Sequence, residues 1–240
     1  MEFLSQFYQA KNDQELLINS EQASAFAKQI AGDYNPIHDP DSRRFCVPGD
    51  LLFAIALDKY GLNSKMAFQF LSLIGADSVL SYPELDTGVV EHEIEVVNDK
   101  GKPVLGLQFS GQSTKEGAKL EQVLRQYVQF SGQNFPHILV PLMEQKNVMI
   151  NPKRPLVIYE KMSFEFQSLD FQELKITLGD TDLDVDGKRG DATLNFTFIA
   201  DGNIIGSGSK TLVLSGLREY DKLEVETMCN AYEASKPKAS

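Results

Sequence analysis

Apolar residues recur at helical spacing near the start of the chain. Between residues 20 and 32, four of them follow the i, i+3, i+4, i+7 pattern of a helix with one buried face: Ala23, Phe26, Ala27 and Ile30. Ser20 is suited to cap the start of this helix and Gly32 to end it. After a polar loop over residues 33–48, the segment 51–57 is apolar on every face, which predicts a helix that is buried all round.

Alternation of apolar and polar residues predicts strands in the rest of this half. We expect them at residues 66–73, 89–97 and 103–112. The same order then returns, with a helix over 121–131, an apolar segment over 138–143, and strands near 156–167, 171–179, 192–200 and 203–214. From about residue 217 the pattern favours an added amphipathic helix that ends near Tyr232, followed by a disordered Ser-Lys-Pro end.

The two series also match in sequence, which indicates an internal repeat. Residues 21–32 read EQASAFAKQIAG and residues 121–132 read EQVLRQYVQFSG. A second match pairs MAFQFLSL at 66–73 with MSFEFQSL at 162–169. We therefore expect two copies of one unit, over 1–118 and 119–220, with a helix and tail over 221–240.

One buried helix followed by antiparallel strands predicts a sheet that curls around the helix, which is the hot-dog arrangement. Such a sheet buries the helix, and a second copy covers the apolar face that remains. The predicted fold class is therefore α+β, a double hot dog in which two curved antiparallel sheets each wrap a central helix.

Charge and cysteine content narrow the partners and the compartment. The formal net charge is −11 and the isoelectric point about 4.8, which argues against nucleic acid and against an anionic membrane surface. The two cysteines, Cys46 and Cys229, stand singly, as is typical of a reducing compartment. No basic stretch followed by an apolar run opens the chain, and the longest apolar run is too short to span a bilayer. We expect a cytoplasmic protein.

The segment 31–38, Ala-Gly-Asp-Tyr-Asn-Pro-Ile-His, carries the candidate chemistry. It resembles the G-D-x-N-P-x-H signature of the MaoC-like, (R)-specific enoyl-CoA hydratases and dehydratases, which have the hot-dog fold. The resemblance implies that Asp33 and His38 hold and activate one water, that Asn35 braces the loop, and that the backbone N–H of Gly49 meets the thioester oxygen. As a whole, the sequence looks closer to a family of proteobacterial proteins with no assigned activity.

The chemistry of hydration suits these residue types. A base must take a proton from water and an acid must protonate the α-carbon, and a carboxylate with an imidazole can share both roles. The enolate-like intermediate needs a donor, which the start of the helix after Pro48 would supply. The negative charge of Asp50 would be unhelpful so close to that oxyanion. By the repeat, Gln133 stands where Asp33 stands, so the second half is expected to be catalytically silent.

Basic residues are few enough in this acidic chain to be informative. Arg43, Arg44, Lys153 and Arg154 are the side chains best placed to meet the phosphates of coenzyme A or of a carrier protein. The implied partner is an acyl-CoA or an acyl-carrier protein, and no metal or redox cofactor is implied. Pairing into a homodimer is left open.

Several alternatives stay open at this stage. Asp-x-Asn-Pro is also good turn chemistry, so Asp33 and His38 could serve a structural turn in a non-catalytic acyl-binding or dimerisation module. Thioesterase activity is a variant within the same fold. The acidic run that begins at Asp182 resembles a calcium loop, but it has Thr193 where the bidentate Glu is required, and its alternation favours a strand.

Overall fold

The apolar segment of the first half forms helix α2, Gly49–Tyr60, in a computed structural model that describes residues 1–237. Every side chain from Leu51 to Leu57 exposes 2% of its surface or less. A helix without a polar face is stable only when it is surrounded, and the expected buried helix is confirmed. Gly61, with φ of +83°, ends it.

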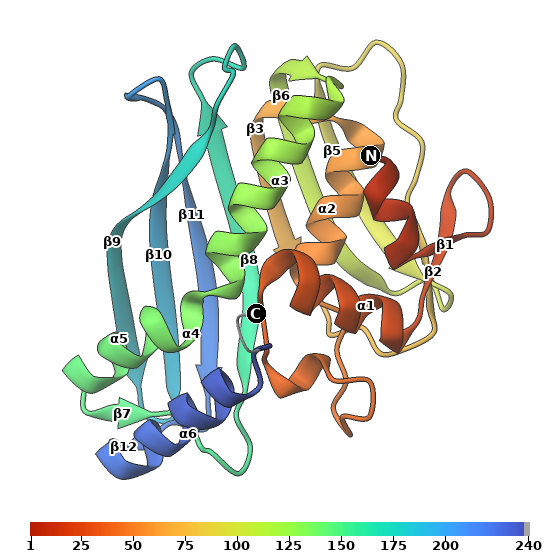
Figure 1. Cartoon of the computed structure of the whole chain (residues 1–240). Coiled ribbons are helices and arrows are strands. Elements are labelled where there is room, and N and C mark those ends of the chain that lie inside the picture. Colours follow the sequence, from red (N-terminus) through yellow and green to blue (C-terminus); the bar gives the residue numbers. More distant parts are fainter. Residues whose placement is uncertain (238–240) are drawn as a thin grey trace.

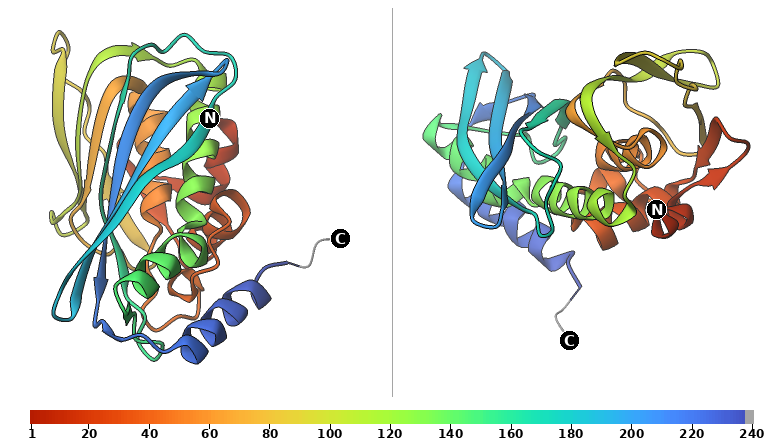
Figure 2. Two further views of the ribbon diagram at one scale, coloured as in Figure 1. Left: turned by 90° about the vertical axis from the view of Figure 1, so that its left-hand side faces the viewer. Right: turned by 90° about the horizontal axis from the view of Figure 1, so that it is seen from above.

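Strands of the first half curl around α2, as the view from above shows (Figure 2). They are β1 (Gln9–Ala10), β2 (Glu15–Ile18), β4 (Ser78–Ser81), β5 (Glu91–Asn98), β6 (Pro103–Thr114) and β3 (Leu62–Phe70). The chain opens with the short helix η1, Glu2–Phe7. The expected strands at 66–73, 89–97 and 103–112 therefore exist with slightly shifted ends, whereas the short strands β1, β2 and β4 were not expected.

Strands of the second half extend the same sheet (Figure 1). They are β8 (Val157–Phe166), β11 (Asn203–Ser215), β10 (Arg189–Ala200) and β9 (Lys175–Asp186). Ten strands of the described chain form one sheet, in the order β1-β2-β4-β5-β6-β3-β8-β11-β10-β9. The α+β fold class with curled antiparallel sheets is confirmed, and the two expected sheets are joined into one.

The junction between the halves is the pairing of β3 with β8. Met66 lies opposite Phe164, and Phe68 lies opposite Met162. In the repeat, Met66 corresponds to Met162 and Phe68 to Phe164. The register is therefore symmetric about the pair Ala67–Ser163, whose two members are themselves equivalent in the repeat. Antiparallel pairing of two similar strands allows this symmetry.

Helix α1, Ser20–Phe26, is capped by Asn19, so the expected cap at Ser20 is wrong by one residue. The Asn19 side chain accepts from the backbone N–H of Gln22 at 2.8 Å, and the Gln22 side chain accepts from the Asn19 N–H at 3.3 Å. This is a capping box, which satisfies two helix-end donors. The helix continues as a π-turn, η2 (Ala27–Ala31), and ends at Gly32 as expected.

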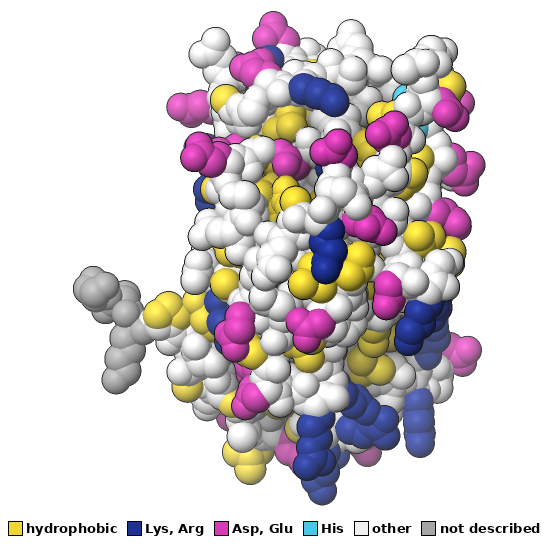
Figure 3. Space-filling model, turned by 90° about the vertical axis from the view of Figure 1, so that its right-hand side faces the viewer, with side chains coloured by type: hydrophobic (Ala, Val, Ile, Leu, Met, Phe, Trp, Pro, Cys, Tyr) yellow, Lys and Arg dark blue, Asp and Glu magenta, His cyan; other side chains and the backbone are white. Residues whose placement is uncertain are grey.

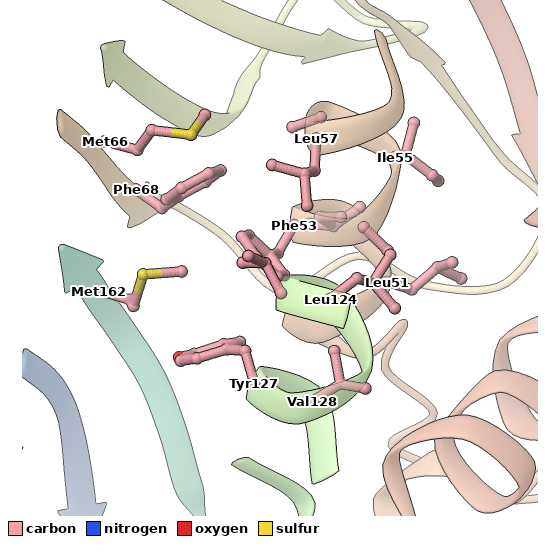
Figure 4. Close-up of a cluster of buried hydrophobic side chains, with 14 of the residues drawn as sticks. Leu51, Phe53, Ile55, Leu57, Met66, Phe68, Leu124, Tyr127, Val128 and Met162 are labelled. Carbon is pink, nitrogen blue, oxygen red and sulfur yellow. The ribbon is translucent and has the colours of Figure 1, made fainter. Parts of the chain in front are cut away.

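Helix α3, Gly117–Gly132, packs beside α2 over the sheet and completes the central core (Figure 4). The ring of Phe53 lies 5.2 Å from that of Phe68 and 5.0 Å from that of Tyr127. A second cluster lies under α4 (Asn134–His137) and α5 (Leu139–Gln145). The apolar segment expected at 138–143 is therefore the start of α5, with Leu139 and Met143 buried.

The end of the described chain forms a small sheet and a last helix. Strands β7 (Val148–Met149) and β12 (Arg218–Glu219) form a small second sheet, and helix α6 follows at Lys222–Ala234. This is the helix expected to end near Tyr232, and the Ser235 hydroxyl after it donates to the carbonyl of Tyr232 at 2.6 Å. The disorder expected beyond it stays a prediction. Residues 238–240 lie outside the described residues. None of the helices in residues 1–237 is long and apolar enough to cross a membrane.

One expected strand was misplaced. The segment 171–174 is irregular, because Phe171 and Leu174 are both buried there under α3, and the strand begins at Lys175. The acidic run from Asp182 lies inside β9 with Leu183 fully buried, so the interpretation as a strand is confirmed.

Removing side-chain volume around α2 tests this core. We expect Leu57→Ala to lower the free energy of unfolding by about 2–5 kcal/mol, because the cavity it leaves is enclosed on all sides. Leu223→Ala removes the same atoms from a side chain that is 73% exposed and should change stability by about 0.5 kcal/mol or less. Urea unfolding at equilibrium measures both, and equal losses would contradict the burial of α2.

Candidate active site

The hydratase-like segment forms a tight loop between η2 and the short helix η3, Pro36–His38. The side chain of Asp33 accepts from the backbone N–H of Asn35 at 2.9 Å, and the side chain of Asn35 accepts from the N–H of Ile37 at 3.1 Å. Asn35 thereby caps η3, because its side chain satisfies a free N–H at the start of that helix. Local chemistry alone thus brings Asp33 and His38 to the same side of the loop.

His38 is held by one ring nitrogen and faces Asp33 with the other. Its Nδ1 lies 2.7 Å from the carbonyl oxygen of Cys46. A carbonyl only accepts, so Nδ1 carries the hydrogen and Nε2 is left for chemistry. Nε2 lies 3.5 Å from Oδ2 of Asp33, and the His38 side chain is only 11% exposed.

Two opposing effects act on the protonation of His38. Burial disfavours the charged imidazolium, but the hydrogen bond and the negative charge of Asp33 favour it, with a further contribution from Asp50. The pKa of His38 therefore lies above its ordinary value.

Gly49 begins α2 and lines the same space. An added Cβ would lie 2.9 Å from Cδ1 of Tyr159 and 3.0 Å from Cε1 of Phe70, so only glycine fits without displacement. The first N–H groups of a helix have no partner within the helix, and they favour an anion. The position therefore suits the expected oxyanion donor.

A cavity of about 540 Å³ opens between the two halves of the chain. Its polar end is formed by Asp33, His38, Asp50, Ser131 and Lys210. Its apolar walls come from both halves and include Leu52, Ile74, Leu139, Ile150, Val157, Leu212 and Met228. The volume and the mixture of many apolar with few polar groups are typical of a site for a small molecule.

Three polar residues of this cavity were missed or misjudged from the sequence. The carboxylate of Asp50 accepts from the Ser131 hydroxyl, with its two oxygens 2.8 and 2.6 Å away, and the Lys210 ammonium donates to the same hydroxyl. All three residues are buried. A signal for Lys210 does exist in the sequence, because strand alternation puts it on the same face as the inward Leu212 and Leu214.

Burial is the largest influence on the pKa of Asp50 and on the pKa of Lys210. It raises the pKa of Asp50, against the opposing charge of Lys210 and the hydrogen bond from Ser131. It lowers the pKa of Lys210, against the charges of Asp50 and Asp33. The Asp50 carboxyl, whose charge was expected to disturb an oxyanion, is linked through the Ser131 hydroxyl to Lys210.

Tyr232 of α6 joins the two repeat units beside the cavity. Its hydroxyl donates to the carbonyl of Gly132 at 3.2 Å and lies 3.5 Å from both the carbonyl of Gly32 and the backbone N–H of Tyr34. Burial and the charge of Asp33 raise the pKa of Tyr232 to about 12. The hydroxyl therefore stays protonated near neutral pH. No pattern in the sequence indicated this role.

The remaining expected residues lie at the rim or away from it. Arg43, Arg44, Lys153 and Arg154 are all exposed, on two loops whose neighbouring residues Cys46, Pro152 and Pro155 line the cavity. Figure 3 shows Lys and Arg side chains gathered at the lower end of one face of this acidic molecule. Gln133 is exposed. His137 is also exposed, ends α4 and does not line the cavity.

Fold and cavity together define a double hot-dog protein with a buried polar site between its halves. The chain belongs to the family described as "Protein of unknown function (DUF3581)", whose model matches residues 2–223. No curated protein matches the chain.

Similar solved structures were found at low identity. They include the acyl-CoA thioesterase II TesB2 of Mycobacterium marinum, with a TM-score of 0.49, 8% identity, and coverage of 92% of this chain and 98% of that one. A conserved protein of unknown function with a hot dog fold from Alicyclobacillus acidocaldarius has a TM-score of 0.49, 10% identity, and coverage of 90% and 98%. The peroxisomal multifunctional enzyme type 2 of Drosophila melanogaster has a TM-score of 0.44, 14% identity, and coverage of 82% and 47%.

The coupling between Asp33 and His38 can be measured directly. Asp33→Asn removes the carboxylate charge that favours the imidazolium, so the pKa of His38 should fall. Titration of the His38 ring signals by NMR, assigned with His38→Gln, measures the shift. Asp170→Asn changes a side chain that is 98% exposed and should leave that pKa unchanged. An unmoved pKa in Asp33→Asn would show that the two side chains do not interact.

Proposed function

We propose that this protein adds water to an enoyl thioester, or removes it in the reverse direction, in the cavity between its halves. The observation that carries the proposal is the Asp33–His38 pair, 3.5 Å apart at the polar end of that cavity, with the opposite nitrogen of His38 fixed by a carbonyl. One polar atom of each side chain is held by the local backbone, and the other faces its partner in the pair at the polar end of the cavity.

In the proposed reaction, Asp33 orients one water and Nε2 of His38 takes its proton. The hydroxide adds to the β-carbon, and the electron pair of the double bond moves to form an enolate of the thioester. The N–H at Gly49 meets the enolate oxygen at the start of α2. The proton then passes from His38 to the α-carbon, so that one water has been added and the pair is restored.

Hydrolysis of the thioester is the second candidate. The same pair could aim water at the carbonyl carbon, since that carbon lies only two atoms from the β-carbon in an enoyl thioester. In that case the carbon–sulfur bond breaks and a thiol leaves. The third reading, a non-catalytic module that only holds an acyl chain, predicts neither product.

We also propose that coenzyme A or a carrier protein is the handle of the substrate. The exposed basic residues on the two loops at the cavity rim support this, because phosphate groups are the natural partners of such side chains. The apolar walls of the cavity, Ile74, Leu139 and Leu212 among them, suit an acyl chain.

The activity test uses crotonyl-CoA with the purified protein. We expect the enoyl absorbance to decrease without release of a free thiol, and Asp33→Asn and His38→Gln to slow turnover by about 100-fold or more. Asp170→Asn and His137→Gln, both exposed, should keep full activity. Thiol release that depends on Asp33 and His38 would favour hydrolysis. The absence of both products would favour the binding module.

The handle is tested by comparing two substrates. Arg43→Ala with Arg44→Ala, or Lys153→Ala with Arg154→Ala, should raise KM for crotonyl-CoA about two- to fivefold, as expected for exposed charge pairs. The crotonyl ester of N-acetylcysteamine has no phosphate, so its KM should not change. Lys100→Ala with Lys102→Ala removes two exposed charges from the turn between β5 and β6, neither of which lines the cavity, and serves as the control. Equal changes for both substrates would contradict phosphate binding.

A further inference from the structure

The chain of hydrogen bonds from Lys210 through Ser131 to Asp50 has no part in the reaction as described above. It joins three elements, β11, α3 and α2, at the polar end of the cavity. Asp50 and Ser131 are each 6% exposed, and Lys210 is 3% exposed.

A purely structural role explains this network poorly. Buried charges cost desolvation energy that their mutual attraction often fails to recover, and apolar residues of similar size commonly serve a core as well or better. Among the buried polar residues of the described chain, only His38, Asp50 and Lys210 are acidic or basic. Charged groups that are buried and lie together in a cavity are candidates for function.

Asp50 places the network beside the residues of the proposed reaction. Asp50 directly follows Gly49, the candidate oxyanion donor, in the first turn of α2. Ser131 directly precedes Gly132, whose backbone lies against Ala31 and Asp33. The ammonium of Lys210 lies 4.0 Å from the centre of the Tyr159 ring, which fixes its direction.

We propose that Lys210, Ser131 and Asp50 form a positioning unit that fixes the charge beside the Asp33–His38 pair and so controls the proton held by His38 during turnover. Ser131 donates its only hydrogen to Asp50 and accepts from Lys210, so the order of donors is fixed. The inference rests on the proposed function, because it concerns the same reaction. The second half of the chain, expected to be silent, would then contribute two residues to the site.

The groups that face Asp50 come from every element packed around it. They are Asp33 and His38 from the loop after η2, Tyr127 and Ser131 from α3, Tyr159 from β8, and Lys210 from β11. The hydroxyls of Tyr127 and Tyr159 bond to each other, and burial holds the pKa of both well above the ordinary value, so neither titrates near neutrality. Of the remaining groups, His38 is the one whose ordinary titration lies closest to neutral pH.

The test is a double variant that keeps the total charge. Asp50→Asn with Lys210→Met removes one negative and one positive group, so the fold loses no net charge and leaves neither partner unpaired. We expect this variant to fold with a Tm at or above that of the wild type. Lys146→Met with Asp182→Asn removes an exposed pair 3.6 Å apart and is the matched control.

With crotonyl-CoA, the double variant should lose about tenfold or more in kcat with KM changed less than about threefold, as expected when positioning rather than binding is lost. The acid limb of its pH profile should move to lower pH, because the Asp50 charge raises the pKa of His38 whereas Lys210 is not among the groups that shift it. The control variant should match the wild type. A double variant that keeps the wild-type kcat and pH profile would overturn the inference and leave the network a structural one.

A measurement without substrate separates this inference from the proposed function. NMR titration of His38 in the double variant should show a lower pKa than in the wild type, whatever reaction the protein catalyses. If the wild type turns over neither enoyl nor acyl thioester, the proposed function fails. If instead the wild type is active but His38 titrates identically in both proteins, the positioning unit alone is refuted.

Discussion

The antiparallel pairing of β3 with β8 joins the two halves of the chain side by side in one sheet, and the site depends on that placement. Once the strands share an edge, the ends of η2 and α3 meet, and Gly32 and Gly132 both lie beside the hydroxyl of Tyr232. A side chain at Gly132 would overlap the carbonyl oxygen of Ala31, so this approach requires glycine. The cavity is the space that remains beside this meeting point.

Charge balance is the second constraint on the cavity. Two carboxylates, one ammonium and one imidazole share a space with apolar walls, where interactions between charges are stronger than in water. Asp33 lies next to His38, whereas Asp50 is linked to Lys210 through Ser131. The carboxylate that follows Gly49 at the start of α2 therefore has its own hydrogen-bond partners within the cavity.

The two repeat units have diverged in complementary ways. With an offset of one hundred residues, Asp33 corresponds to Gln133, which cannot act as a base, and Ala31 corresponds to Ser131. The first unit thus holds the Asp33–His38 pair, and the second supplies a hydroxyl that reaches Asp50. Comparing the two units by sequence shows that residue 133 is not a carboxylate. It does not show that the hydroxyl of Ser131 contacts Asp50.

Local features of this protein were determined by its sequence. The buried helix α2 and most of the longer helices and strands follow from periodicity. The closeness of Asp33 to His38 follows from a short turn, since neighbours in the chain cannot lie far apart. Only the tertiary structure decided the rest. Ser131 is 81 residues from Asp50 and 79 from Lys210, and such contacts arise when packed layers bring distant segments together. Alternation in β11 indicates that Lys210 points inward, but what it meets there depends on where α3 ends.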